Sequence, residues 1–172
     1  EKFTEFISEL PDIPSLASCD DDRLMRLWEG MGYYSRARNL KKCAAVLMDQ
    51  YDGKLPEERE ELIRLPGIGP YTAGAVSAIA YGRPAAAVDG NVMRVLARLS
   101  GMEDDIRDAH TKQMMEEIIL HCYDSWSPEQ KTVRDFTQAW MEIGALVCVP
   151  NGPPRCSECP FEHICTACRE RS

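Results

Sequence analysis

The segment that most constrains the fold is residues 65–98, LPGIGPYTAGAVSAIAYGRPAAAVDGNVMRVLAR. Its first six residues, LPGIGP at 65–70, join two stretches of helical pattern, and the two glycines can take the positive-φ conformations that a tight turn needs. Pro70 suits the first turn of the next helix, residues 71–80, because its φ is already helical and its missing N–H is not needed there. The sequence therefore predicts a helical hairpin.

This hairpin is also a candidate anion site. Backbone N–H groups of a Gly-x-Gly turn at a helix N-terminus point toward one place, where they attract anions such as phosphate. Further along the chain, VDGNV places Asp89 just before another predicted helix, residues 92–99. A phosphate cradle followed by a single carboxylate suggests chemistry on a nucleic-acid strand.

Helical spacing accounts for most of the remaining chain. No segment alternates apolar and polar residues like a strand, so the sequence predicts an all-α protein. Ser127 is a candidate N-cap, with Pro128 at the first helical position. The other predicted helices are residues 1–7, a helix ending near Trp28 after a cap at Ser18 or Asp20, and residues 36–51, 56–64, 108–122 and 127–148.

Length and charge narrow the function classes. A chain of 172 residues forms one domain or two small lobes that share a core. No apolar run is long enough to span a bilayer. The net charge of −8 argues against a nonspecific nucleic-acid binder. Acidic and basic residues are grouped separately, however, so we expect a dipolar molecule with weak salt-driven binding to DNA.

Five of the eight cysteines crowd the C-terminal segment, namely Cys148, Cys156, Cys159, Cys165 and Cys168. Without a signal-peptide pattern, such crowding favours a metal site over a disulfide framework. The segment is rich in proline and has almost no apolar core, so a metal would have to order it. The first four cysteines, C-x7-C-x2-C-x5-C, and the last four, C-x2-C-x5-C-x2-C, both suit thiolate ligation. Spacing alone leaves iron–sulfur and zinc open.

Several motifs together resemble one family. They are the two motifs of residues 65–98, WEGMGYYSRARNL at 28–40, FTQA at 136–139, GALVC at 144–148 and the cysteine segment. In this order they resemble the endonuclease III superfamily of DNA glycosylases and, within it, the MutY-type adenine glycosylases. The resemblance implies an all-α helix-hairpin-helix fold with a C-terminal iron–sulfur loop. It also implies a lobe of residues 1–125, with the hairpin and a catalytic aspartate, and a lobe of residues 126–172, with a helix and the cluster loop.

The resemblance implies a base-excision-repair enzyme that removes adenine mispaired with 8-oxoguanine or guanine by hydrolysing the N-glycosidic bond. A thymine or other mismatch glycosylase and a non-catalytic helix-hairpin-helix DNA-binding module are the alternatives. The implied partner is double-stranded DNA containing a mispaired adenine. We expect a monomer without membrane contact, in the cytoplasm with the nucleoid, or in the nucleus or an organelle of a eukaryote.

Asp89 is the candidate catalytic residue. An aspartate before a helix is also a common N-cap, and Asp89 can serve both purposes. A carboxylate beside a flipped nucleotide stabilises the oxocarbenium-like charge that develops as the glycosidic bond breaks. The resemblance assigns that role to Asp89 and supporting roles to Asn91 and Tyr71. Tyr71 stands where bifunctional glycosylase-lyases carry a lysine that forms a Schiff base, so we expect a monofunctional enzyme.

The resemblance further implies DNA contacts by Gly67, Gly69, Tyr33, Tyr34, Arg36, Arg38 and Arg94. Tyr33 would fill the base stack as a wedge, although two tyrosines at a helix start can also simply pack. It also implies a [4Fe-4S] cluster held by Cys148, Cys156, Cys159 and Cys165, with Cys168 left as a free thiol. The first interval is one residue longer than the usual family spacing, which a loop can absorb.

Adenine excision also requires an acid that protonates the leaving base. Similar enzymes carry a glutamate in a W-x-S-E-x-M-L-Q-Q-T type segment, which would lie upstream of Glu1, and many have an 8-oxoguanine recognition domain that would follow Ser172. We therefore expect the chain to be the catalytic core of a longer protein, inactive or impaired by itself.

Overall fold

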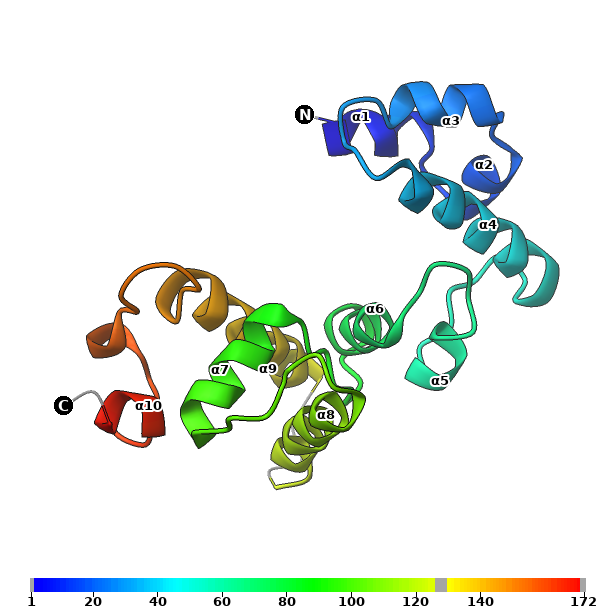
Figure 1. Cartoon of the computed structure of the whole chain (residues 1–172). Coiled ribbons are helices and arrows are strands. Elements are labelled where there is room, and N and C mark those ends of the chain that lie inside the picture. Colours follow the sequence, from blue (N-terminus) through cyan, green and yellow to red (C-terminus); the bar gives the residue numbers. More distant parts are fainter. Residues whose placement is uncertain (1, 126–129, 171–172) are drawn as a thin grey trace. The chain divides into compact units, whose positions relative to one another are not determined.

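The computed structural model describes residues 2–125 and 130–170, and throughout this part the chain forms helices joined by loops, without strands (Figure 1). The predicted all-α class is therefore confirmed. The chain divides into two compact units, residues 1–69 (the N-terminal unit) and residues 70–172 (the C-terminal unit). The boundary predicted after residue 125 adjoins the undescribed residues 126–129, so the lobes 1–125 and 126–172 stay a prediction.

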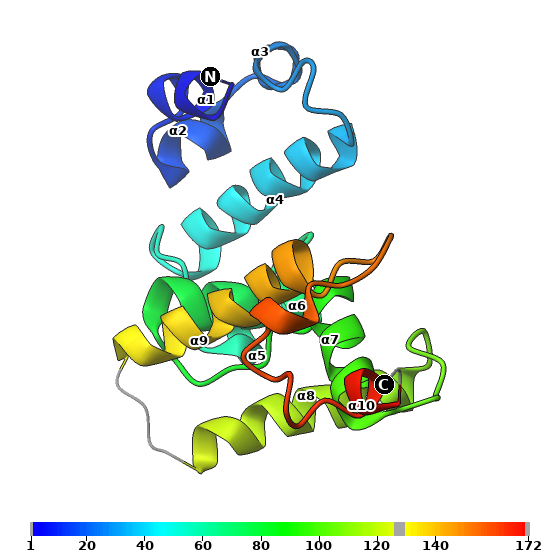
Figure 2. The same cartoon turned by 90° about the vertical axis from the view of Figure 1, so that its left-hand side faces the viewer.

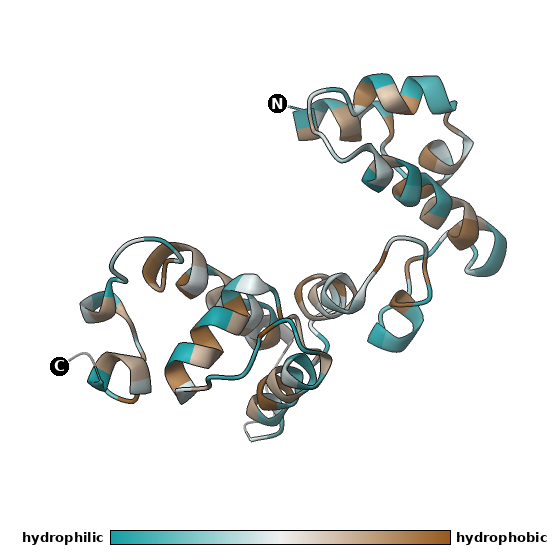
Figure 3. Cartoon of the chain, in the orientation of Figure 1, coloured by the Kyte–Doolittle hydropathy of each residue, from teal (hydrophilic) through white to brown (hydrophobic). Residues whose placement is uncertain are grey.

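The N-terminal unit contains α1 (Lys2–Glu9), α2 (Ile13–Ser18), α3 (Asp21–Leu27), α4 (Tyr34–Gln50) and α5 (Arg59–Leu62). Its helices carry both apolar and hydrophilic residues (Figure 3), and the apolar side chains of α1 to α4 form one small core that includes Phe6 and Leu24. Asp20 is the N-cap of α3, where its carboxylate accepts from two backbone N–H groups. Of the two predicted caps, Asp20 is therefore the one that the chain uses.

The predicted helix at residues 56–64 is wrong in its extent, because α5 covers only Arg59–Leu62. The chain then enters the hairpin, where Gly67 has a φ of +79° and a Cβ at this position would lie 2.5 Å from the Cβ of Asn39. Gly67 is therefore required both by its conformation and by the close approach of α4. As predicted, α6 (Pro70–Ala75) begins at the proline.

In the C-terminal unit, α6 continues into the π-helical turn η1 (Val76–Ala80). It is followed by α7 (Gly90–Ser100), α8 (Ala109–Asp124) and α9 (Gln130–Glu142), and α9 packs against η1 and α7 (Figure 2). The core between them includes Val92, Leu96, Met115, Ile119 and Val133. The predicted cap at Ser127 lies outside the described residues.

The C-terminal segment follows the second π-helical turn, η2 (Ile143–Val147), which continues α9 up to Cys148. A loop then leads through the short 3₁₀ helix η3 (Cys156–Glu158) to α10 (Thr166–Arg169), which packs against α7. Within the described ranges, no helix combines the length and apolar character needed to cross a membrane.

Candidate active site and cysteine pocket

Asp89 occupies the N-cap position of α7, so the capping interpretation is correct as far as it goes. Its Oδ1 accepts hydrogen bonds from the backbone N–H groups of Asn91 and Val92, both at 2.9 Å. Its Oδ2 accepts from the Asn91 side-chain amide at 3.2 Å. The carboxylate is thus oriented at both oxygens, and capping uses only one of them.

Arg94 holds Asn91 in this position. Its Nη2 donates to the Asn91 Oδ1 at 2.8 Å and to the Gly144 carbonyl at 2.5 Å, while its Nε donates to the Cys148 carbonyl at 2.8 Å. Because Oδ1 of Asn91 faces the guanidinium, its Nδ2 must face Asp89. The hydrogen bonds therefore run without interruption from the backbone of Cys148 to the carboxylate of Asp89.

Sequence reasoning assigned Arg94 to DNA and missed this arrangement. The spacing of Asn91 and Arg94 on one helix was the available signal, since residues three apart are neighbours on the helix surface. The partners Gly144 and Cys148 lie 50 and 54 residues further along the chain and are not visible in any local pattern. A DNA contact by Arg94 stays a prediction, and it would compete with these three hydrogen bonds.

Gly144 lets η2 approach the start of α7 closely. A Cβ at Gly144 would lie 2.5 Å from the Cβ of Asn91 and 3.0 Å from its Cα. Contacts this short are sterically forbidden, so any other residue would push Asn91 away. The glycine of the GALVC motif is thereby explained by the position of Asn91.

Tyr71 lies in the first turn of α6, with 41% of its surface exposed. Its hydroxyl donates a long, weak hydrogen bond of 3.9 Å to the Sδ of Met141. Burial and, secondly, the negative charge of Asp89 raise the pKa of Tyr71 above its usual value. The C-terminal unit thus places a neutral phenol and an oriented carboxylate in one electrostatic neighbourhood, which suits the stabilisation of a developing positive charge.

Four of the six predicted DNA-contacting residues of the N-terminal unit lie at the start of α4, and the other two, Gly67 and Gly69, lie in the hairpin before α6. Tyr33, with a φ of +47° and 77% of its surface exposed, precedes the helix. The Arg36 guanidinium lies 4.7 Å from its ring centroid, a cation–π contact. Tyr34, Arg36 and Arg38 are also exposed. Packing does not explain why the Tyr33 ring is so exposed. Its role as a wedge stays a prediction.

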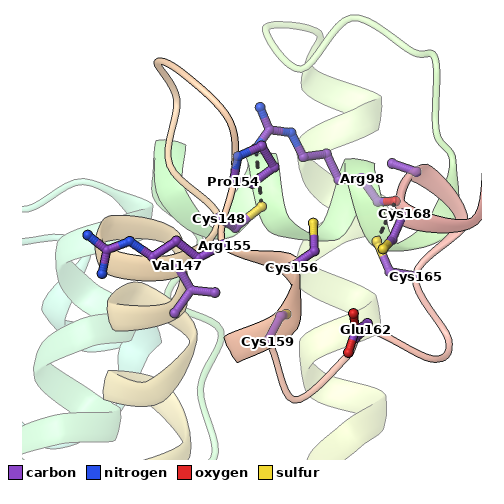
Figure 4. A pocket seen from close by; sticks show the side chains of 11 residues that line it. Arg98, Val147, Cys148, Pro154, Arg155, Cys156, Cys159, Glu162, Cys165 and Cys168 are labelled. Carbon is purple, nitrogen blue, oxygen red and sulfur yellow. Dashed lines mark hydrogen bonds between the residues drawn. The ribbon is translucent and has the colours of Figure 1, made fainter. Parts of the chain in front are cut away.

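All five C-terminal cysteines line one pocket, together with Arg98 of α7 (Figure 4). None of them is part of a disulfide. The Nη1 of Arg98 donates to the Cys148 thiol at 3.2 Å and to the Val149 carbonyl at 3.0 Å. The Arg98 side chain thus links the part of the pocket around Cys148 to α7. Arg98 is a further residue that sequence reasoning did not assign to this site.

The longer first interval between the cysteines is absorbed by the loop at residues 149–155. Gly152 has a φ of +78°, and the Arg155 N–H donates to the Val147 carbonyl at 3.0 Å, which closes the loop. Burial and the neighbouring cysteines raise the pKa of Cys159. Among residues 2–125 and 130–170, no group of three or more histidine, cysteine or acidic side chains is arranged to hold a metal ion.

Comparisons with known proteins agree with this geometry. Residues 1–121 match the family model described as HhH-GPD superfamily base excision DNA repair protein. The chain is 39% identical over 166 residues to the adenine DNA glycosylase of Homo sapiens, covering 96% of the chain and 29% of that relative. It is 36% identical over 172 residues to the enzyme of the same name from Schizosaccharomyces pombe, covering 99% and 36%.

The chain therefore spans about a third of the length of these two relatives. Solved structures extend the similarity to the fold. A thermostable thymine-DNA glycosylase superposes with a TM-score of 0.85 at 25% identity, covering 98% of the chain and 75% of that structure. A non-covalent endonuclease III–DNA complex gives a TM-score of 0.79 at 26% identity, covering 99% and 75%.

Proposed function

The chain belongs to the HhH-GPD superfamily of base excision DNA repair proteins, and we propose that it is the core of a DNA glycosylase that removes adenine mispaired with 8-oxoguanine or guanine. The oriented carboxylate of Asp89 is the observation that carries this proposal. The relatives named adenine DNA glycosylase support adenine as the base.

In the proposed reaction, Asp89 offsets the positive charge that builds up on the deoxyribose as the bond to the base breaks. Asn91 and Arg94 keep its Oδ2 in place, so little reorganisation is needed in the transition state. The Tyr71 phenol cannot form a Schiff base with the sugar. The expected product is therefore an abasic site in an uncut strand.

Double-stranded DNA is the proposed partner. The N–H groups of the turn around Gly67 and Gly69, which directly precedes α6, are suited to a backbone phosphate. Arg36 and Arg38 would contact further phosphates, and Tyr33 would fill the gap left by the extruded base. The endonuclease III–DNA complex among the similar structures supports DNA as the ligand of this fold.

We further propose a [4Fe-4S] cluster held by Cys148, Cys156, Cys159 and Cys165. These residues fit it because all four thiols line the same pocket and none is tied up in a disulfide. Each thiolate of a cubane binds its own iron, so the ligands surround the cluster and need not converge on a single ion. When bound, the cluster would link the end of η2 and the short helix η3 to the start of α10. Iron and zinc analysis of the purified protein tests this proposal, and zinc alone would contradict it.

A panel of mispaired duplexes tests the main proposal, using the protein in its full natural length. We expect abasic sites opposite 8-oxoguanine and guanine where adenine stood. Thymine is the competing base, because a thymine-DNA glycosylase shares the fold. Excision of thymine with adenine untouched would favour that alternative. Tight duplex binding without any abasic product would instead identify a non-catalytic DNA-binding module.

A further inference from the structure

The cysteine pocket contains one thiol more than a cubane cluster needs, because five cysteines line it and four would bind iron. We propose that the fifth, Cys168, is a reserve ligand that can take the place of Cys156. This inference rests on the proposed cluster, and it concerns a residue to which the proposed function gives no role.

Cys168 and Cys156 are neighbours within the pocket. Cys156 of η3 and Cys168 of α10 both line the pocket, and their thiols are close enough to interact electrostatically. Figure 4 shows both side chains, together with Cys165, bordering the same hollow. A thiol that borders the same pocket beside a ligand needs only a small movement to replace it.

The backbone that carries Cys168 is held in place at two points. Gly101 ends α7 with a φ of +72°. A Cβ added at this position would lie 2.7 Å from the Thr166 side chain, so α10 packs directly against the end of α7. The Cys165 thiol donates to the Arg98 carbonyl at 3.4 Å. Cys165 and Cys168 are three residues apart across this short helix and so share one side of it. Cys168 is thereby fixed beside the pocket.

The proposed exchange is specific for Cys156. Cys148 is held by Arg98, whose side chain donates a hydrogen bond to the Cys148 thiol. A long loop separates Cys148 from Cys156. In the exchange, Cys168 gives up its thiol proton and its sulfur forms a bond to the iron that Cys156 releases. The departing Cys156 thiolate takes up a proton. One iron–sulfur bond replaces another and no electron is transferred, so no oxidant or reductant is required.

Three serine variants test this inference: Cys156→Ser, Cys168→Ser and the double variant. Serine is similar in size, but its hydroxyl is a poor substitute for the soft thiolate. We expect Cys168→Ser and Cys156→Ser each to keep the visible absorption of the cluster and about four irons per chain. The double variant should lose both. The readouts are iron content and absorption, with helix content from circular dichroism as a check of folding.

Cys159→Ser is the matched control, since it removes a thiol of the same pocket for which Cys168 is not expected to substitute. We expect this variant to lose its iron. If Cys156→Ser loses iron or fails to fold while the wild-type protein contains four irons, the reserve-ligand role is refuted and the cluster stands. If Cys159→Ser also keeps its iron, the specific pairing with Cys156 is wrong. A wild-type protein without iron would overturn the proposed cluster itself.

Discussion

The side chains of Arg94 and Asn91 are joined by a hydrogen bond of 2.8 Å from Nη2 to Oδ1, one turn apart on α7. This bond decides which way the asparagine amide points, and the amide in turn reaches Asp89. Arg94 therefore orients the Oδ2 of the proposed catalytic carboxylate indirectly, through Asn91, while backbone N–H groups hold its Oδ1.

Replacing Asp89 with asparagine separates capping from catalysis. Asparagine is nearly isosteric and its oxygen still caps the helix, so the protein should fold, with a modest loss of stability because its amide nitrogen cannot accept the hydrogen bond from Asn91. Its neutral amide cannot offset a developing positive charge, so we expect base excision to slow by at least about 100-fold while DNA binding persists. Single-turnover excision measures the reaction, a duplex-binding assay measures DNA binding, and thermal unfolding checks the fold.

Asp108→Asn provides the control for that prediction. Asp108 caps α8 in the same way, accepting from the backbone N–H groups of His110 and Thr111 at 2.8 and 3.2 Å. Asp108→Asn should cost only what the cap costs, Asp89→Asn should lower thermal stability somewhat more because it also loses the hydrogen bond from the Asn91 amide, and only Asp89→Asn should change excision. An active Asp89→Asn protein would leave Asp89 as a helix cap alone.

Arg94→Lys should weaken both the fold and the reaction. Lysine keeps the charge, but it lacks the planar guanidinium that reaches Asn91, Gly144 and Cys148 together. We expect a loss of about 2 kcal/mol in the free energy of unfolding, as for lost hydrogen bonds to a charged group. Excision should slow as well. Arg107→Lys, at an exposed arginine that pairs with Asp105, should do neither.

Gly144→Ala should displace Asn91, because the added Cβ would lie 2.5 Å from the asparagine Cβ. We expect a destabilisation of about 1–3 kcal/mol, typical of overpacking, together with slower excision. Gly90→Ala is the stability control, since a Cβ there meets nothing within 4 Å. Equal unfolding temperatures for the two variants would contradict the close approach of η2 to α7.

The pKa of Tyr71 provides a test of its proximity to Asp89. Because burial and the Asp89 charge raise this pKa, the phenol should ionise only at a pH above the usual tyrosine range. Native stability gained from the neutral phenol is present below the unfolded pKa and is lost as the pH rises through the folded one. In Asp89→Asn, the pKa of Tyr71 should fall, while burial keeps it raised. Ultraviolet titration, with Tyr71→Phe subtracted, measures the shift.

Tyr33→Ser should leave stability unchanged, because 77% of the tyrosine is exposed. If Tyr33 is the wedge, its loss should weaken binding to a mispaired duplex by about tenfold, as expected for a stacking side chain. Phe3→Ser is a matched control in the same unit, since Phe3 is 75% exposed. An equal effect of the two substitutions on DNA binding would argue against the wedge.

The local features of this fold were predictable from sequence because short-range chemistry determines them. Pro70 begins α6, and Asp20, Asp89 and Asp108 each cap a helix through their own side chains. The extent of α5 was not predictable in the same way. The acidic run after Pro56 has helical propensity, yet the helix begins only at Arg59, after Glu58 as N-cap.

The two π-helical turns and the hydrogen-bond partners of Arg94 could not be predicted from the sequence either. A π-helical turn keeps the apolar composition of the helix that it interrupts and changes only the hydrogen-bond register. The contacts of Arg94 join segments 50 and 54 residues apart, which are brought together by packing and not by local preference.

In the π-helical turn η2, the number of residues is constrained more strongly than their identity. One residue of an α-helix corresponds to a rotation of about 100°. A single deletion within residues 143–147 would therefore swing the Cys148 carbonyl away from Arg94 even if every remaining side chain were kept. The neighbouring loop of residues 149–155 has no such register to keep. Across natural variants, insertions and deletions should be confined to the loop and absent from the turn.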